Sequence, residues 1–190
     1  MRRTLNLVLP LAISVACVSL CYTFLQIRTE RRNLRTEQTR RSAIVAENIA
    51  ETIESSRDKV TSKNLSRLLY RYVPRESLSG IAVYDPSGAV RAITPGLPLR
   101  FDQPPPEALR AIKVGAPASD FVAVEGSTLN IYSLPVLHDG ELLGIVVVIS
   151  DASYIQARVM RTLRASSFTA LVQTIFITAL AFILVLRPRM

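Results

Sequence analysis

The sequence lacks the residues that most often carry out catalysis or bind metals. Its 190 residues include one histidine, two cysteines and no tryptophan. Cys17 and Cys21 lie one helical turn apart within an apolar segment, so they cannot pair with each other, and packing is the expected role of both thiols. Because the sequence contains no histidine or cysteine cluster, it offers neither a zinc site nor a cysteine–histidine nucleophile. We therefore expect no enzyme, no metal and no cofactor.

Charged residues are missing from two long segments, Thr4–Ile27 and Ala165–Leu186. Each is long enough to cross roughly 30 Å of hydrocarbon at about 1.5 Å per residue. Arg2 and Arg3 precede the first segment, which is typical of an uncleaved signal anchor. We expect residues 1–27 to be this anchor, residues 165–187 to be a second transmembrane helix, and residues 188–190 to be a short cytoplasmic tail.

The formal net charge of +8 comes from arginines that gather beside these two apolar segments. Lipid headgroups of the bilayer are therefore the expected counterions, and nucleic acid is not an expected partner. Many arginines lie on the proposed outer side, against the positive-inside rule, but the connecting stretch far exceeds the roughly 60 residues to which that rule applies. We expect a multi-pass protein of the inner (cytoplasmic) membrane whose central domain, residues 28–164, is extracytoplasmic (periplasmic).

The first part of the central domain has a helical pattern. Arg28–Arg57 contains no proline or glycine, and one stripe recurs every three or four residues: Leu34, Gln38, Ser42, Val45, Ile49 and Ile53. Since the stripe is apolar only in its second half, the helix is expected to meet the domain near Val45–Ile53 and to be solvated closer to the membrane. Leu65–Tyr72 repeats the helical spacing in a shorter helix stopped by Pro74.

The remaining central residues have strand patterns with one short helix among them. Ser79–Thr94 is expected to form a hairpin, and Phe121–Glu125 a further strand. Between them a proline-rich loop leads to a helix, Glu107–Val114, that ends at Gly115.

Thr128–Ile155 predicts two strands followed by a helix. The strands turn at Asp139-Gly140, a strong hairpin signal. The returning strand, Leu142–Ile149, is almost wholly apolar, so we expect it to be central in its sheet or buried on both faces. Asp151 suits the N-cap of a helix that begins at Ala152 and runs into the second apolar segment. The fold class predicted is α+β, an antiparallel sheet of five strands with a long N-terminal helix, flanked by two transmembrane helices.

This order of elements, over roughly Arg28–Arg164, resembles the PAS-like extracytoplasmic sensor modules called PDC or Cache domains. Four segments are similar to the N-terminal membrane region found on some bacterial trehalose-phosphate synthases: RTERRNLR (Arg28–Arg35), GIAVYDPSG (Gly80–Gly88), TPGLP (Thr94–Pro98) and DASYI (Asp151–Ile155). The resemblance implies a homodimer and a small-molecule ligand. It carries over no catalytic residue, because the glycosyltransferase part is not among these residues.

In modules of this resemblance, cations and hydroxyls often hold the ligand, which points to five residues: Tyr84, Arg91, Arg100, Tyr132 and Asp151. The alternatives are solvent-facing arginines, core tyrosines and, for Asp151, a purely structural cap. His138, beside Asp139, is expected on the surface of a turn, with a titrating role near neutral pH as the alternative.

We therefore expect a membrane-anchored extracytoplasmic sensor that passes the state of its ligand through the second transmembrane helix to a cytoplasmic output domain or protein outside this chain. The alternative is a membrane-anchored structural or assembly protein that binds a partner protein. Acid–base chemistry is unsupported, because Asp120 and Glu125 have no partner carboxylate at a spacing that the sequence supports.

Overall fold

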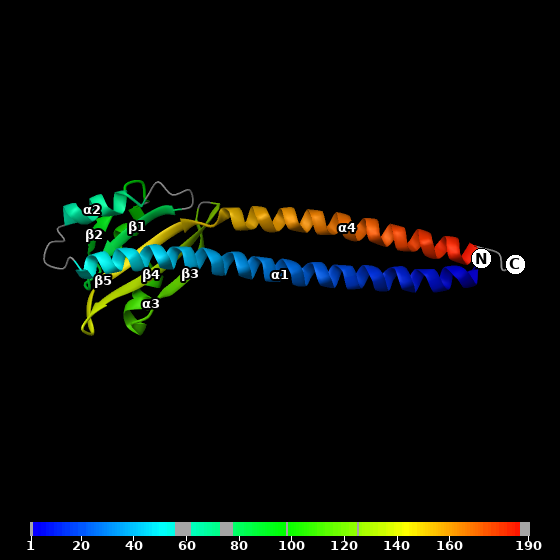
Figure 1. Cartoon of the computed structure of the whole chain (residues 1–190), viewed down its shortest axis with the longest axis horizontal. Helices are drawn as coiled ribbons and strands as arrows, with labels where there is room; N and C mark the ends of the chain where they lie inside the picture. The colour runs from blue at the N-terminus through cyan, green and yellow to red at the C-terminus, as the bar shows by residue number, and fades with distance from the viewer. Residues whose placement is uncertain (1, 56–61, 73–77, 98, 125, 187–190) are drawn as a thin grey trace. The chain divides into compact units, whose positions relative to one another are not determined.

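The computed structural model describes residues 2–55, 62–72, 78–97, 99–124 and 126–186. They fall into two compact units: a helix pair, Met1–Leu34 with Ile155–Met190, and a sheet domain, Arg35–Tyr154. In chain order the elements are α1 (Arg2–Ser55), α2 (Ser62–Tyr70), β1 (Leu78–Tyr84), β2 (Val90–Ile93), the 3-10 helix η1 (Leu99–Asp102), α3 (Pro106–Val114), β3 (Ala118–Val124), β4 (Ser127–His138), β5 (Glu141–Asp151) and α4 (Ser153–Leu186) (Figure 1).

The described strands form one antiparallel sheet of five strands in the order β2-β1-β5-β4-β3. β5 is central and its residues from Ile145 to Ser150 are buried, as the apolar run predicted. Asp139 and Gly140 connect β4 to β5 with φ values of 50° and 84°, the left-handed backbone that a two-residue hairpin turn requires. The predicted α+β class and the five-stranded sheet are confirmed.

Each face of the sheet has its own apolar core. On one face α1 and α2 pack against the strands; the buried residues are Ala46, Ile49, Ile53, Leu65, Leu69, Ile81, Val83, Ala92, Tyr132, Val136, Val146 and Val148. On the other face α3 and η1 pack; the buried residues are Ala82, Tyr84, Phe101, Ala108, Ile131, Ile145, Val147 and Ile149. The alternation of side chains along each strand thus divides the sheet into an α1 face and an α3 face.

The membrane-proximal part of the predicted amphipathic helix differs from the prediction. Gln38 and Ser42, expected to be solvated, are 1% and 2% exposed. The reason is that the sheet offers them hydrogen-bonding partners. Ser42 Oγ lies 3.1 Å from Ser150 Oγ, and Gln38 accepts a 3.0 Å bond from the Tyr154 hydroxyl. A polar stripe is therefore buried here by polar partners, which periodicity in one segment cannot reveal.

Several observed bounds of helices and strands differ from the predicted bounds by a few residues. α3 begins at Pro106 and ends, as expected, before Gly115, whose φ is 66°. β3 begins at Ala118, three residues before the predicted start, and β4 continues through Pro135 to His138. α4 begins at Ser153 and runs unbroken to Leu186. Pro74 and Glu125 lie outside the described residues.

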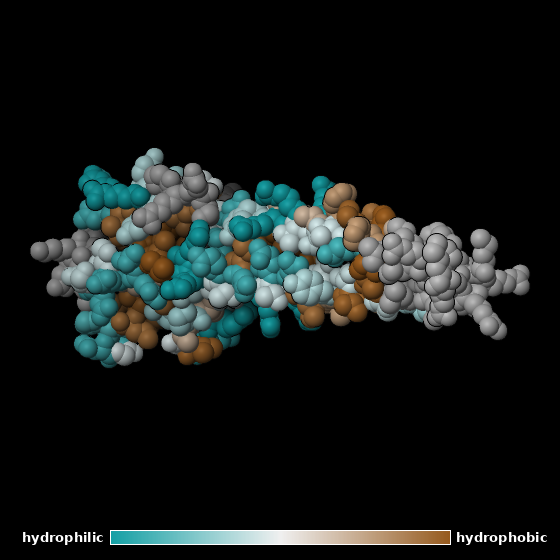
Figure 2. Space-filling model, turned by 45° about the vertical axis from the view of Figure 1, so that its right-hand side comes forward, coloured by the Kyte–Doolittle hydropathy of each residue, from teal (hydrophilic) through white to brown (hydrophobic). Residues whose placement is uncertain are grey.

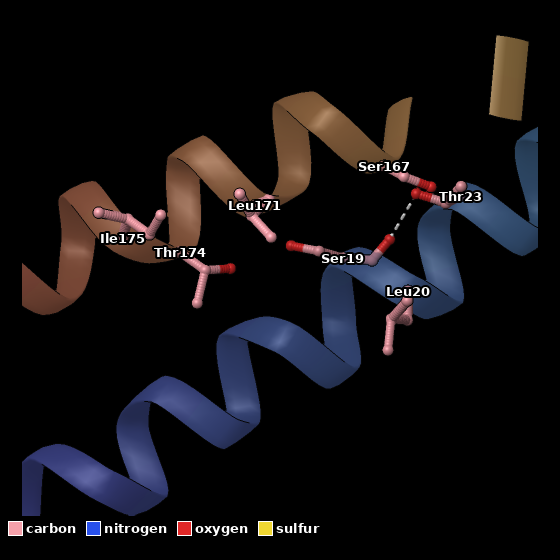
Figure 3. A pocket seen from close by; sticks show the side chains of 7 residues that line it. All are labelled: Ser19, Leu20, Thr23, Ser167, Leu171, Thr174 and Ile175. Atoms are coloured by element: carbon pink, nitrogen blue, oxygen red, sulfur yellow. Dashed lines mark hydrogen bonds between the residues drawn. The ribbon is translucent and has the colours of Figure 1, made fainter. Parts of the chain in front are cut away.

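The helix pair buries or half-buries several hydroxyl side chains and exposes large apolar side chains. Ser19, Thr23, Ser166 and Thr174 are buried or half-buried, and Thr23 donates a 2.8 Å hydrogen bond to the Ser19 carbonyl (Figure 3). Large apolar residues are exposed instead, among them Val18, Leu20, Phe24, Phe168, Leu171, Val172, Ile175 and Phe176. These apolar side chains form brown patches on the helical surface (Figure 2). Over the described residues, none of the helices is both long and apolar enough to span a membrane.

Candidate functional site

The α3 face of the sheet holds a buried tyrosine that ties the loop after β2 to β1. Tyr84 is fully buried, and its hydroxyl donates to the carbonyl of Phe101 at 2.6 Å and to that of Gln103 at 3.3 Å. Burial, with a smaller contribution from the charge of Asp102, raises the pKa of the Tyr84 phenol well above its ordinary value. Phe101 is fully buried as well, so this loop forms part of the core.

Beneath α3 the sheet has a row of small side chains. Ala118, Ser133, Val147 and Ala82 lie directly opposite one another across β3, β4, β5 and β1, so their side chains share the α3 face. Ala108 of α3 and Phe101 of η1 belong to the same buried cluster as Ala82 and Val147, so these side chains pack over the row.

Two buried polar groups in this layer have no hydrogen-bond partner among the described residues: Glu107 Oε2 and Ser133 Oγ. Glu107 is 4% exposed and Ser133 is fully buried. Glu107 shares the buried side of α3 with Ala108 and Ala111, and α3 contacts β4, the strand that carries Ser133. Leaving a buried polar atom unpaired costs about 1–3 kcal/mol, so the α3 face holds two groups that a hydrogen-bonding ligand would stabilise.

The structure separates the two predicted tyrosines. Tyr84 belongs to the core of the α3 face, whereas Tyr132 belongs to the core of the α1 face. Burial, with a smaller contribution from the charge of Glu47, raises the pKa of Tyr132. The two side chains therefore lie on opposite faces of the sheet.

The predicted arginines and aspartate lie at three other places. Arg91 is half-buried in β2, opposite the irregularity in β1 between Val83 and Tyr84. Arg100 is in η1, and its side chain is outside the described part of the chain. Asp151 is exposed, and its carboxylate accepts a 2.8 Å hydrogen bond from the Ser153 backbone N–H, which gives it the predicted capping role at the start of α4.

His138 lies at the end of β4 and is half-buried. Its Nδ1 is 3.0 Å from Glu54 Oε1 on α1, and its Nε2 is 3.4 Å from Asp139 Oδ2. The predicted turn histidine therefore joins the hairpin to the end of α1. Among the described residues, these three included, no group of three or more histidine, cysteine, aspartate or glutamate side chains could hold a metal ion.

The fold has relatives among solved structures. The ligand-binding domain of the Pseudomonas aeruginosa amino-acid chemoreceptor PctC in complex with GABA matches with a TM-score of 0.57 and 19% identity, over 72% of this chain and 62% of that one. The sensory domain of the Campylobacter jejuni chemoreceptor Tlp3 with isoleucine bound matches with a TM-score of 0.54 and 13% identity, over 78% and 65%. The sensor domain of the V. cholerae histidine kinase DctB matches with a TM-score of 0.53 and 14% identity, over 72% and 56%.

The sheet domain has the fold of a bacterial sensory domain. These structures are ligand-binding or sensory domains, and the likeness shows that this chain shares their fold, as the order of elements predicted. At these identities the likeness extends to the fold alone, and the chain spans between 56% and 65% of the length of the three. No protein-family model and no curated protein matches the sequence. The likeness to the trehalose-phosphate synthase region stays a prediction.

Sequence reasoning missed Glu107 and Ser133. Glu107 follows Pro105 and Pro106 at the start of a helix, where an acidic residue is ordinarily a solvent-exposed partner of the helix dipole. Ser133 was inconspicuous inside an alternating strand. The signal that could have revealed Ser133 is its spacing from Ile131. Residues two positions apart in a strand point to the same face, so Ser133 shares the face of the buried Ile131.

Proposed function

We propose that this chain is the input module of a membrane-anchored extracytoplasmic sensor, and that its α3 face binds a small molecule carrying an amino group. The observation that supports this most directly is the pair of unpartnered buried groups, Glu107 Oε2 and Ser133 Oγ, within one helix–sheet layer. A carboxyl oxygen only needs a donor, and an ammonium group supplies three of them. GABA and isoleucine, bound to PctC and Tlp3, both carry an amino group.

The other predicted residues take supporting roles in this proposal. Arg91 and Arg100 would attract the acidic end of such a ligand, because guanidinium groups bind carboxylates in a bidentate manner. Tyr84 would hold the loop from Phe101 to Gln103 over the site through its two hydrogen bonds. Tyr132, on the other face, would contribute to the core rather than to the ligand. Asp151 would transmit a ligand-dependent movement of β5 to α4, because its carboxylate accepts a hydrogen bond from the Ser153 backbone N–H at the start of that helix.

Thermal unfolding of the full chain in detergent tests the binding site. The probes are the common amino acids and GABA, with butyrate as a matched control that lacks the amino group of GABA. We expect at least one amine to raise the Tm, as a ligand that binds only the folded state must. Glu107→Gln should abolish that rise while leaving the fold intact, because the amide keeps the size of the side chain.

Glu141→Gln is the control for the charge change, since Glu141 is exposed at the start of β5. An unchanged response of Glu107→Gln to the amine would place the ligand elsewhere. A complete absence of stabilisation by any amine would contradict the proposed ligand class.

The membrane anchor in this proposal is supported by the sequence and by the helix pair. Thr4–Ile27 and Ala165–Leu186 contain no charged residue. In the helix pair Thr23 is buried and Ser19 half-buried, whereas large apolar side chains are exposed, which is the reverse of what water favours. A bilayer favours this arrangement, because lipid acyl chains surround the outward-facing apolar side chains. Small residues between two spanning helices also let the helices approach closely.

A reporter active only after export tests the topology. Insertion between Asp139 and Gly140 is suitable because both residues are exposed in a tight turn, whereas the loop before α3 contains the fully buried Phe101. We expect activity at this position. Activity from a cytoplasmic reporter at the same position would reverse the topology without affecting the ligand-binding part of the proposal. From the sheet, the ligand state would pass along α4 to a cytoplasmic output, with a synthase of the trehalose-phosphate type as one example.

A further inference from the structure

The helix pair has a groove lined in part by glutamine side chains, here called the glutamine groove, on one side of its contact line. This groove, of about 420 Å³, is lined from α4 by Ala165, Ser166, Thr169 and Gln173, and from α1 by residues that include Tyr22 and Gln26. The groove on the other side, of about 320 Å³, is lined from α4 by Ser167, Leu171, Thr174 and Ile175 (Figure 3). Glutamine side chains therefore line one groove only.

Gln173 is the residue in the glutamine groove that a bilayer would tolerate least. Ala165–Leu186 is centred between Ile175 and Phe176, so Gln173 is about 4 Å from the centre of the apolar segment at about 1.5 Å per residue. Its side chain is exposed. At that depth no water is present to bond the amide, and an acyl chain offers neither donor nor acceptor. Gln26, in contrast, is one residue from the end of its charge-free segment, where headgroups and water are available.

We propose that the groove is occupied by α4 of a second copy of this chain, and that Gln173 bonds Gln173 of the partner subunit across a two-fold axis. This inference rests on the membrane anchor of the proposed function. A primary amide carries both a donor and an acceptor, so it is complementary to itself, and a two-fold axis brings a residue near that axis against its own copy. Ala165 and Thr169 precede Gln173 by two turns and one turn on the same groove and are small enough for close backbone approach.

A second copy fits this groove better than lipid does. An acyl chain would fill the volume between Tyr22 and Thr169 but would leave the Gln173 amide unbonded. The opposite groove, with Leu171 and Ile175, suits acyl chains, because these side chains are apolar and exposed. The two grooves thus differ in chemistry, because only one of them contains an amide that needs a hydrogen-bonding partner. The second copy is therefore expected in the groove that contains Gln173.

Cysteine crosslinking of the full chain in phosphatidylcholine–phosphatidylglycerol vesicles tests the inference. With Cys17→Ala and Cys21→Ala as background, Thr169→Cys should form a crosslinked dimer on mild oxidation, and Ile175→Cys on the other groove should form far less. Gln173→Leu should weaken dimerisation about 3- to 30-fold, the range measured for polar contacts between spanning helices. Gln173→Asn, which keeps the amide, should restore much of the crosslinking. Gln26→Leu, made at the end of a segment, should leave it unchanged.

Two results would overturn the inference. Equal crosslinking from Thr169→Cys and Ile175→Cys would mean that no groove is preferred, and undiminished crosslinking in Gln173→Leu would mean that the amide does not hold the dimer. Extraction of the vesicles with alkaline carbonate separates these failures from failure of the anchor. A chain that stays in the membrane and lacks the crosslink contradicts the inference alone, whereas a chain released by carbonate contradicts the proposed anchor together with the inference.

Discussion

Ser42 of α1 and Ser150 of β5 are 108 positions apart in the sequence, yet their hydroxyl oxygens lie 3.1 Å apart in the interior. Asn130 Nδ2 on β4 donates a 3.2 Å hydrogen bond to the same Ser42 oxygen. One turn earlier on α1, Gln38 Oε1 accepts from the Tyr154 hydroxyl on α4. This polar cluster of five residues joins α1 to β4, β5 and the first turn of α4. It lies next to the apolar core of Ala46, Ile49 and Ile53 and fixes the position of α1 along the sheet.

Ser42→Ala should destabilise the chain by about 1–3 kcal/mol, because it leaves the Ser150 hydroxyl and the Asn130 amide without their shared partner in a buried place. Asn130 is sensitive to this loss, since its Oδ1 is already unpaired within the described structure. Chemical unfolding in detergent measures the change. Ser119→Ala, at an exposed position of β3, is the matched control and should shift the unfolding free energy by less than about 0.5 kcal/mol. Equal shifts in the two variants would mean that the cluster contributes no stability.

Gly80 allows the loop after β2 to pack on β1. A Cβ atom at this position would lie 2.5 Å from both Leu97 Cγ and Thr94 Oγ1, and Thr94 Oγ1 accepts a 2.9 Å hydrogen bond from the Ile81 backbone N–H. We expect Gly80→Ala to cost about 1–3 kcal/mol through overpacking. A double-mutant cycle with Leu97→Ala should recover part of that loss, because the smaller side chain makes room. Strict additivity of the two substitutions would contradict the proposed clash.

Stability should fall in alkaline solution because of Tyr84. Its pKa is raised in the folded chain, so the unfolded state loses the phenolic proton first, near the ordinary value of about 10. The stabilising contribution of the neutral phenol is therefore complete below about pH 10 and is lost as the pH rises toward the folded pKa, by at most about 1.4 kcal/mol per pH unit. Tyr132, whose pKa is also raised, adds to the same trend.

Unfolding curves between pH 8 and 11, a range chosen to bracket the ordinary tyrosine pKa of about 10, measure this slope. Tyr84→Phe should flatten the slope, although it lowers stability at neutral pH by removing the hydrogen bond to the Phe101 carbonyl. Tyr70→Phe removes an exposed tyrosine and is the control for composition. An unchanged slope in Tyr84→Phe would assign the alkaline instability to other groups.

The sequence predicted the parts of the fold that local chemistry determines. Asp139-Gly140 indicated a left-handed turn, Gly115 the end of a helix, and the apolar run before Ser150 a strand that is central in its sheet or buried on both faces. In each case the cause lies within a few residues of the effect, so no knowledge of the tertiary structure was needed.

What the sequence could not predict depends on partners that are distant in the chain. Gln38 and Ser42 are buried because they have polar partners: Tyr154 for Gln38, and Asn130 and Ser150 for Ser42. The periodicity of the α1 segment does not reveal partners that lie in other segments. The separation of Tyr84 from Tyr132 depends on the register between strands, which sets the face of each side chain. Of the predicted site residues, Tyr84 lies on the α3 face, while the unpaired groups of that face, Glu107 and Ser133, became visible only with α3 placed on the sheet.

α4 connects the end of β5 to the second apolar segment. α4 contains neither proline nor glycine from Ser153 to Leu186 and is one unbroken helix, capped at its start by Asp151. A ligand that prefers one arrangement of the sheet shifts the equilibrium between two positions of this helix. The free energy of that shift cannot exceed the difference between its binding free energies for the two arrangements.

Inserting Gly-Gly after Tyr154 should keep folding and ligand binding but remove the connection, because the insertion leaves β5 and the apolar segment intact. Crosslinking between cysteines at the exposed position of Thr169 in paired chains, with and without the amine found by thermal unfolding, measures the connection. The same Gly-Gly pair inserted after Gly140, in the exposed hairpin turn, is the control and should leave the response to ligand unchanged. If crosslinking still responds to ligand after the insertion at Tyr154, the signal travels through α1, and the contact between Ser42 and Ser150 becomes the place at which to interrupt it.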